Sequence, residues 1–324
     1  MREKRSQQTF GETSRRGFLG GVGAVVAAAA YSGTVAADDA ARVTNDADDP
    51  VQTVESPDGS IAVTVDAADG VPTYEVARDG STHVGPSTLG FDFRNQPSFG
   101  ASADGEAGPV TVTGTERESA TEEWEPVWGA YESVSAEYNA VSVGLADAAA
   151  GESDGSDGGP AEARSATLQF RVFDDGVGFR VVLGEGFASN AARAVVASEN
   201  TGVDFAADHT AWWIENRVTN PRFEQEYAET PLSEIPGGSD PRRPTNTPMR
   251  DGAHTPLTVD ADGAYLSVHE ANLDDYAAAT LAPRSGDGGT AFATELTPLP
   301  DGTKASLELP AATPWRTIQV VDRP

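Results

Sequence analysis

The chain has 324 residues, with 51 acidic and 22 basic side chains, a formal net charge of -29 and no cysteine. So negative a field disfavours nucleic acid and anionic membrane surfaces as partners, and the lack of cysteine excludes disulfides, thiolate metal sites and cysteine nucleophiles. The 38% hydrophobic content, much of it in alternating runs, indicates a folded protein with an acidic surface suited to concentrated salt, rather than a disordered chain.

The N-terminal segment has the features of a twin-arginine export signal. Arg15 and Arg16 stand directly before an Ala/Gly-rich apolar run at residues 17–30, and small residues follow at 35–37. The run is too short and too weakly hydrophobic to span about 30 Å of hydrocarbon. We therefore expect residues 1–37 to be a cleaved signal peptide, and the mature protein to be extracellular and free of the membrane. The alternative is an uncleaved anchor.

After the signal, the pattern changes from acidic and aperiodic to alternating. Residues 38–50 are small and acidic, which predicts a flexible leader, and the folded domain is predicted over 51–324. Within residues 60–80, apolar and polar side chains alternate, and Asp-Gly pairs at 69–70 and 79–80 mark turns. These features predict β-hairpins.

Short apolar runs bounded by Gly, Pro, Asp or Ser continue to the C-terminal end. No amphipathic helical stretch stands outside the signal, so the predicted fold is all-β, a large two-sheet sandwich of roughly twelve to eighteen strands. The runs are "VTVTG", "YNAVSVGL", "ATLQFRVF", "VGFRVVL", "AYLSVHEA", "AAATLAP", "TAFATEL", "ASLELP" and "WRTIQVV".

Two segments depart from this pattern. Residues 146–163 are of low complexity and lack apolar side chains for packing, so we expect a disordered loop between two strands. Residues 216–256 contain seven prolines and several charges, which indicates a structured binding loop.

Few motifs for catalysis are present. The chain has no G-x-S-x-G elbow, phosphate-cradling glycine loop or dinucleotide fingerprint. Asp174 and Asp175 form a carboxylate pair, but Asp-Asp-Gly is also ordinary hairpin chemistry, and we favour a turn. The histidines are scattered without zinc-binding spacing: His83, His209, His254 and His269.

The tryptophans suggest a sugar-binding surface. In "TAWWIEN", Trp212 and Trp213 must point to opposite faces if the segment is extended, so one ring can lie in the core and the other at the surface. An exposed indole is a good platform for the C–H face of a sugar. Trp124, Trp128 and Tyr131 form a second aromatic group; the alternative is that all these rings fill the core.

The stretch "YLSVHEANLDDY" places a carboxylate on an apolar face. Glu270 shares a strand face with Leu266 and Val268, whereas Tyr265 and His269 face the other way. An unpaired charge on such a face is costly, so we expect Glu270 to have a specific partner.

Several of these stretches together, over residues 51–324, resemble the N-terminal region of glycoside hydrolase family 97. The stretches are "SPDGSIAVTV", "EPVWGAY", "FRVFDDGVGFR", "TAWWI", "YAETPLSEI", "NTPMR", "YLSVHEANLDDYAAATL" and "TPWRTIQVVDRP". The resemblance implies exported α-glucosidases or α-galactosidases, with an N-terminal β-super-sandwich of the galactose-mutarotase-like type followed by a (β/α)8 barrel. It also implies a calcium ion between sandwich and barrel, to which the sandwich contributes one glutamate.

Carried onto this sequence, the resemblance matches the calcium-binding glutamate to Glu270. It also implies an α-linked oligosaccharide as the ligand. The residues expected to line that sugar site are Trp212, Trp213, Glu229, Glu234 and His269.

Glycoside hydrolysis needs two carboxylates flanking one bond, and in the family both belong to the barrel. We therefore expect a sandwich module that is inactive alone. Either a separately encoded catalytic barrel is its partner, or the gene is a truncated remnant, and whether the module acts in an enzyme is left open. One alternative is a stand-alone secreted carbohydrate-binding protein. Another is a mutarotase-like enzyme using His269 and Glu270, which is disfavoured because adjacent strand residues face opposite ways.

Overall fold

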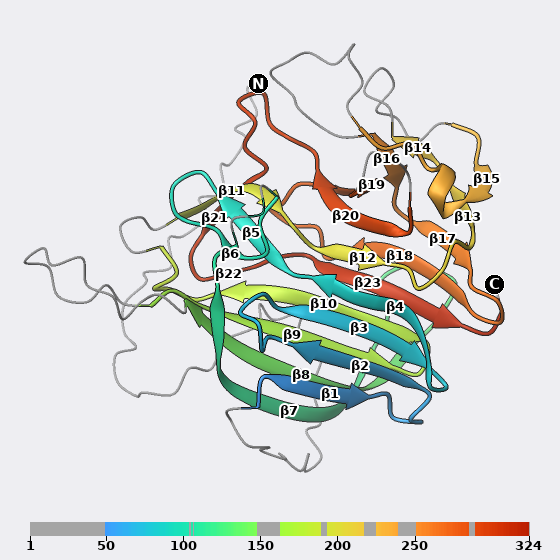
Figure 1. Ribbon diagram of the computed structural model, residues 1–324. Coiled ribbons are helices and arrows are strands. Elements are labelled where there is room, and N and C mark those ends of the chain that lie inside the picture. The colour runs from blue at the N-terminus through green and yellow to red at the C-terminus, as the bar shows by residue number, and fades with distance from the viewer. Residues whose placement is uncertain are drawn as a thin grey trace, which may run out of the picture. The chain divides into compact units, whose positions relative to one another are not determined.

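The computed structural model describes residues 49–103, 105, 107–147, 163–188, 193–216, 225–238, 251–284 and 289–323. The predicted signal peptide, nearly all of the leader, most of the low-complexity segment and part of the proline-rich segment lie outside these residues. Within them, no helix is long and apolar enough to cross a membrane. The described chain consists almost wholly of antiparallel strands (Figure 1), which confirms the all-β prediction.

A ten-stranded sheet forms one layer of the sandwich, in the order β15-β13-β17-β18-β23-β10-β9-β8-β7, with β22 pairing beside β10. Its strands are β7 (Val110–Trp124), β8 (Val134–Asp147), β9 (Ser165–Phe173), β10 (Gly176–Leu183), β13 (Thr210–Trp213), β15 (Ala228–Pro231), β17 (Leu257–Asp260), β18 (Tyr265–Ala271), β22 (Ala311–Ala312) and β23 (Trp315–Val321). A short 3-10 helix, η1 (Leu232–Glu234), follows β15.

Three smaller sheets lie opposite. The first contains β1 (Val51–Glu55), β2 (Ile61–Asp66), β3 (Thr73–Arg78) and β4 (Ser81–Thr88). The second contains β21 (Ala305–Glu308), β11 (Arg193–Glu199), β5 (Gly90–Phe93) and β6 (Phe99–Gly100). The third contains β12 (Gly202–Asp204), β20 (Ala291–Leu296), β19 (Ala279–Pro283), β16 (Gly252–His254) and β14 (Glu215–Asn216).

The division into sheets is finer than the sequence predicts. The described residues form 23 strands in four sheets, where patterning predicts roughly twelve to eighteen strands in two sheets. Strands β6, β14 and β22 have only two residues each, too few for alternation to reveal them. An isolated bridge between Val84 and Phe205 joins the first and third small sheets.

The predicted hairpin turns are confirmed. Gly70 lies between β2 and β3 with a φ of 78°, and Asp79 and Gly80 join β3 to β4 with φ values of 48° and 77°. Positive φ at both central residues is what a tight hairpin turn requires, and Asp-Gly adopts it at low cost. Asp174 and Asp175 form the turn between β9 and β10, so this carboxylate pair is structural as expected.

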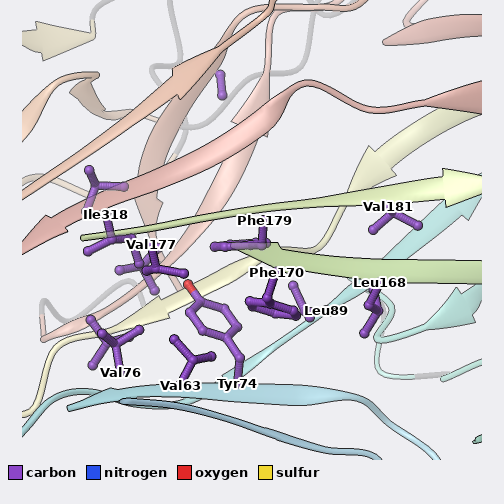
Figure 2. Packing of buried hydrophobic residues seen from close by; sticks show 14 of the residues in the cluster. Val63, Tyr74, Val76, Leu89, Leu168, Phe170, Val177, Phe179, Val181 and Ile318 are labelled. Carbon is purple, nitrogen blue, oxygen red and sulfur yellow. The ribbon is translucent and has the colours of Figure 1, made fainter. Parts of the chain in front are cut away.

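Aliphatic side chains and several aromatic rings fill the space between the ten-stranded sheet and the smaller sheets (Figure 2). Tyr74 of β3 packs against Phe179 and Phe170, with ring centroids 4.7 and 6.0 Å apart. Its hydroxyl donates a hydrogen bond to the Gly202 carbonyl at 2.8 Å, and burial raises its pKa far above the usual value. Each such fully buried side chain contributes about 1.5–3 kcal/mol. Burial alternates along strands such as β9 and β18, so the side chains on the opposite, outer face of the ten-stranded sheet are more exposed than those in the core.

Candidate functional site

Strand β18 sorts its side chains between these two faces as alternation predicts. Leu266 and Val268 are buried against the core, whereas Tyr265 is half-buried and His269 is exposed on the outer face. Glu270 lies on the core side with the apolar pair. One short strand thus contributes side chains both to the core and to the outer face of the sheet.

Trp212 brings a second aromatic ring to the outer face. It lies opposite Glu229 on β15 and Thr258 on β17, and Thr258 lies opposite Ser267 on β18. Paired residues on adjacent strands share a face. The Trp212 ring stacks on that of Tyr265, with centroids 6.4 Å apart and planes at 27°. The outer-face cluster comprises Trp212, Tyr265, Glu229 and His269.

Two of the residues expected in the sugar site lie elsewhere. Trp213 is 5% exposed and points into the core, where its indole N–H donates to the Thr230 hydroxyl at 3.1 Å. Its burial speaks against the predicted contact with a sugar, and Trp212 takes the surface position. Glu234 is exposed on η1, and within the described residues no hydrogen bond or ion pair ties it to the outer-face cluster.

Glu270 has a buried partner. It lies directly opposite Arg316 of β23, whose Nη1 donates to Glu270 Oε2 at 2.6 Å. The backbone N–H of Ala279 approaches both carboxylate oxygens, at 3.3 and 3.2 Å. The expectation of a specific partner for this carboxylate is therefore met by an arginine and a backbone amide.

Arg316 also binds a second carboxylate, Glu199 at the end of β11. Its Nε and Nη2 donate to the two oxygens of Glu199 at 2.8 and 2.6 Å, and the Tyr276 hydroxyl donates to Glu199 at 2.9 Å. Glu199 is only 2% exposed at its side chain. Burial opposes its ionisation, but the charge and hydrogen bonds of Arg316 outweigh burial and lower the pKa of Glu199. Burial, and next the charge of the same carboxylate, raise the pKa of Tyr276 well above its usual value.

The predicted calcium role of Glu270 stays a prediction, and the contacts of this residue do not fit it. Calcium takes six to eight oxygen ligands, whereas the Glu270 carboxylate is already paired with the Arg316 guanidinium. No group of three or more His, Asp or Glu side chains in the described part of the chain is arranged to hold a metal, so a calcium ion here would need ligands from outside these residues. A cavity beside Arg316 is about 10 Å³, room for one water at most.

Trp315 forms a further cluster on the outer face with two arginines. The Arg180 guanidinium lies 4.5 Å from the Trp315 ring centroid and the Arg171 guanidinium 5.2 Å from it. Arg171 also covers the Tyr138 ring at 4.4 Å and forms an ion pair with Glu122 at 3.2 Å. In a chain this acidic, the group is a local concentration of positive charge.

The longest hairpin carries an exposed aromatic tip. Strands β7 and β8 stay paired out to Trp124 and Val134, beyond the point where β8 leaves β9 at Asn139 (Figure 1). The alternative that these rings fill the core is therefore wrong for this group. The hairpin tip comprises Trp124, Val127, Trp128 and Tyr131, which are 47%, 94%, 87% and 74% exposed.

Comparison with known proteins shows to which family the chain belongs. The model of the family described as "Glycosyl-hydrolase 97 N-terminal" matches residues 54–324. The chain belongs to glycoside hydrolase family 97. The match covers the strands that bear the outer-face cluster, the Arg316 contacts and the hairpin tip.

Solved structures of family 97 enzymes agree with this assignment. An enzyme from Pseudoalteromonas sp. strain K8 in complex with acarbose is 29% identical, with a TM-score of 0.69 over 84% of this chain. A variant of that enzyme in complex with panose gives the same values. A β-arabinopyranosidase, 22% identical with a TM-score of 0.64 over 84% of this chain and 40% of its own, supports the fold alone. The chain spans 36% of the length of the K8 enzyme.

Arg316, Glu199 and Tyr276 were not singled out from the sequence of this family 97 chain. Arg316 and Tyr276 stand within stretches that carry the family resemblance. A usable signal existed for Arg316, because alternation in "WRTIQVV" places it on the same strand face as Ile318 and Val320. Two oppositely charged residues at inward positions, Glu270 and Arg316, are candidates for a buried pair. Nothing local marks Glu199.

Proposed function

We propose that this family 97 chain binds α-linked oligosaccharides through the outer-face cluster, as the sandwich module of an exported α-glycosidase. The observation that carries the proposal is the stacked pair of Trp212 and Tyr265 on an open sheet face. Aromatic rings offer an apolar surface to sugar C–H groups. Glu229 and His269, exposed on the same face, supply hydrogen-bonding groups for hydroxyls.

The ligands of the relatives support the choice of sugar. The K8 enzyme has been solved with acarbose and with panose. Glucose and galactose specificity are not distinguished by the residues of the outer-face cluster, so the proposal extends to α-linked oligosaccharides as a class.

The proposed role is binding and orientation, without bond cleavage by these residues alone. Two carboxylates that flank one glycosidic bond must lie about 5–5.5 Å apart for retention or about 6.5–9.5 Å apart for inversion. Glu229 is the carboxylate of the outer-face cluster, and Asp260, opposite Tyr265 on the same face, has no contact with Glu229 among the described residues. We therefore assign the catalytic carboxylates to a barrel of the family 97 type, which this module does not span. Calcium has no step in this proposal, because the contacts of Glu270 do not fit it.

The hairpin tip supports the existence of that partner. A soluble monomer seldom leaves several large apolar side chains uncovered in one loop, and such patches mark interaction sites. Trp128 and Val127 are almost fully exposed. The matched enzymes contain a further part of the chain that this module does not span, and we propose that the tip contacts it.

The proposal is tested by calorimetric titration of the mature chain with acarbose and panose in molar salt. We expect binding heat with both, and binding that is about tenfold weaker when Trp212 is replaced by alanine. No heat from a chain that circular dichroism shows to be folded would refute sugar binding by the outer-face cluster.

A stand-alone carbohydrate-binding protein is the alternative, and it shares the same cluster. The two differ in what the hairpin tip does. Mixing the chain with the product of a barrel-encoding reading frame, followed by assay of a nitrophenyl α-glycoside, distinguishes them. Activity that depends on both products supports the module, whereas sugar binding with neither association nor activity supports the stand-alone protein.

A further inference from the structure

The connection between β18 and β19, residues 272–278, has an unusual backbone. Asn272 and Asp275 have φ values of 55° and 48°, in the left-handed region that residues other than glycine adopt infrequently. Leu273 is 46% exposed on the same connection. Backbone of this kind persists when surrounding contacts determine its conformation. The contacts that do so here are found at the end and in the middle of the connection.

Both contacts lead to Arg316. At the end of the connection, the Ala279 N–H binds the carboxylate of Glu270, which is paired with Arg316 Nη1. In the middle, the Tyr276 hydroxyl binds Glu199, which is paired with the other two donors of the same guanidinium. The guanidinium carbon also lies 5.9 Å from the Tyr276 ring centroid. One arginine therefore holds two carboxylates, and each carboxylate holds one point of the connection.

We propose that Arg316 is a positioning residue that fixes residues 272–278 through Glu199 and Glu270, an arrangement here called the Arg316 clamp. We also propose that Glu270 is part of this clamp and does not bind calcium. The proposal disagrees with the role that the family resemblance implies for Glu270. A calcium ion on Glu270 would have to displace Arg316 or lie beside its charge. Removing one partner from a buried ion pair leaves an uncompensated charge inside the protein, which is strongly unfavourable.

The clamp bears on the proposed sugar site because residues 272–278 follow His269 by only a few positions. The connection therefore starts next to His269, the last residue of the outer-face cluster on β18. Its conformation determines which residues adjoin the cluster at that end. The inference itself is independent of the proposed function, because it rests on contacts among Arg316, Glu199, Glu270, Tyr276 and Ala279 and would hold for a chain that binds no sugar.

The test is amide hydrogen exchange on the mature chain and on the Glu270→Gln variant, combined with calorimetric titration by calcium chloride. We expect exchange at residues 272–279 to rise by about tenfold or more in the variant, because local opening becomes easier. The calcium titration should be the same for both proteins. Unchanged exchange at 272–279, or a calcium affinity lost in the variant, would overturn the proposal.

Two further variants separate a clamp from a general loss of stability. Tyr276→Phe removes only the hydroxyl that reaches Glu199, so it should fold and still raise exchange in the same segment. Asp147→Asn breaks a comparable pair, in which Arg164 Nε lies 2.7 Å from Asp147, on strands remote from the connection. It should lower the melting temperature and leave exchange at residues 272–279 as in the wild type. An equal rise in both variants would show that the effect is global and contradict the clamp. Acarbose titration of the same proteins reports separately on the proposed function.

Discussion

Trp212 and Tyr265 stack on each other across strand β17, with ring centroids 6.4 Å apart and planes at 27°. The two rings come from β13 and β18, more than 50 residues apart in the sequence. Together they form one apolar platform on the outer face of the sheet. Because the platform lies on the outer face of the ten-stranded sheet, a ligand can reach it without any opening of the core.

We expect Trp212→Ala to weaken binding of acarbose by about tenfold, equivalent to about 1.4 kcal/mol. The reason is loss of the larger ring of the platform, and Tyr265→Ala should have a smaller effect in the same direction. Calorimetric titration measures both. Trp128→Ala is the matched control, since it removes an exposed indole that lies away from the outer-face cluster. Equal weakening by the control would show that the platform is not the binding site.

The buried pair of Glu199 and Arg316 predicts an acid-dependent contribution to stability. The folded state lowers the pKa of Glu199 below the ordinary value of 4.5, so the contribution is fully present above that value and is lost as the pH falls below it. At pH 7, we expect Glu199→Gln to lower the free energy of unfolding by about 3 kcal/mol. Denaturant unfolding of both proteins between pH 7 and about pH 2 checks this. A gap between wild type and variant that stays constant over the range would contradict the assignment.

The net charge of -29 predicts that the fold depends on salt. At molar salt the Debye length is about 3 Å, so repulsion among the surface carboxylates is mostly screened. We expect the thermal midpoint to rise from low salt to molar sodium chloride, and the chain to lose structure when it is desalted. Circular dichroism that is unchanged over this range would refute the expectation.

Export by the twin-arginine route is a prediction that rests on Arg15 and Arg16. Replacing both by lysine keeps the charge and removes the paired guanidinium groups, so the chain should remain inside the producing cells. Immunoblots of cells and medium measure the distribution. Secretion of the variant at the wild-type level would mean that another signal directs this chain.

Local alternation was sufficient to predict much of the architecture. It gave the all-β class, the hairpin turns at Asp79 and Asp174, and the opposite orientations of Trp212 and Trp213. It also placed Glu270 on the core side of its strand. In each case the information lies within a few residues, because side chains alternate with a period of two along a strand.

Relationships between distant strands were not predictable in the same way. The pairing of Glu270 with Arg316 depends on the register of β18 against β23, and that of Glu199 depends on how β11 packs over the sheet. Neither the register nor the packing can be predicted from the alternation of a single strand. The sequence left open whether Trp128 is exposed or buried for a related reason: only the full length of the β7–β8 pairing shows that the hairpin continues beyond its neighbours.

The exposed hairpin tip also gives the molecule an optical probe of its own. Of the five tryptophans, Trp124 and Trp128 lie at the tip, whereas Trp212 lies on the sheet face and Trp213 in the core. Indole emission shifts to shorter wavelength when water is excluded from the ring. A protein that covers the tip and a sugar that covers Trp212 should therefore each blue-shift the emission, and a Trp128→Phe variant would remove most of the first shift and keep the second. Docking and ligand binding can thus be followed separately in one cuvette, without a label.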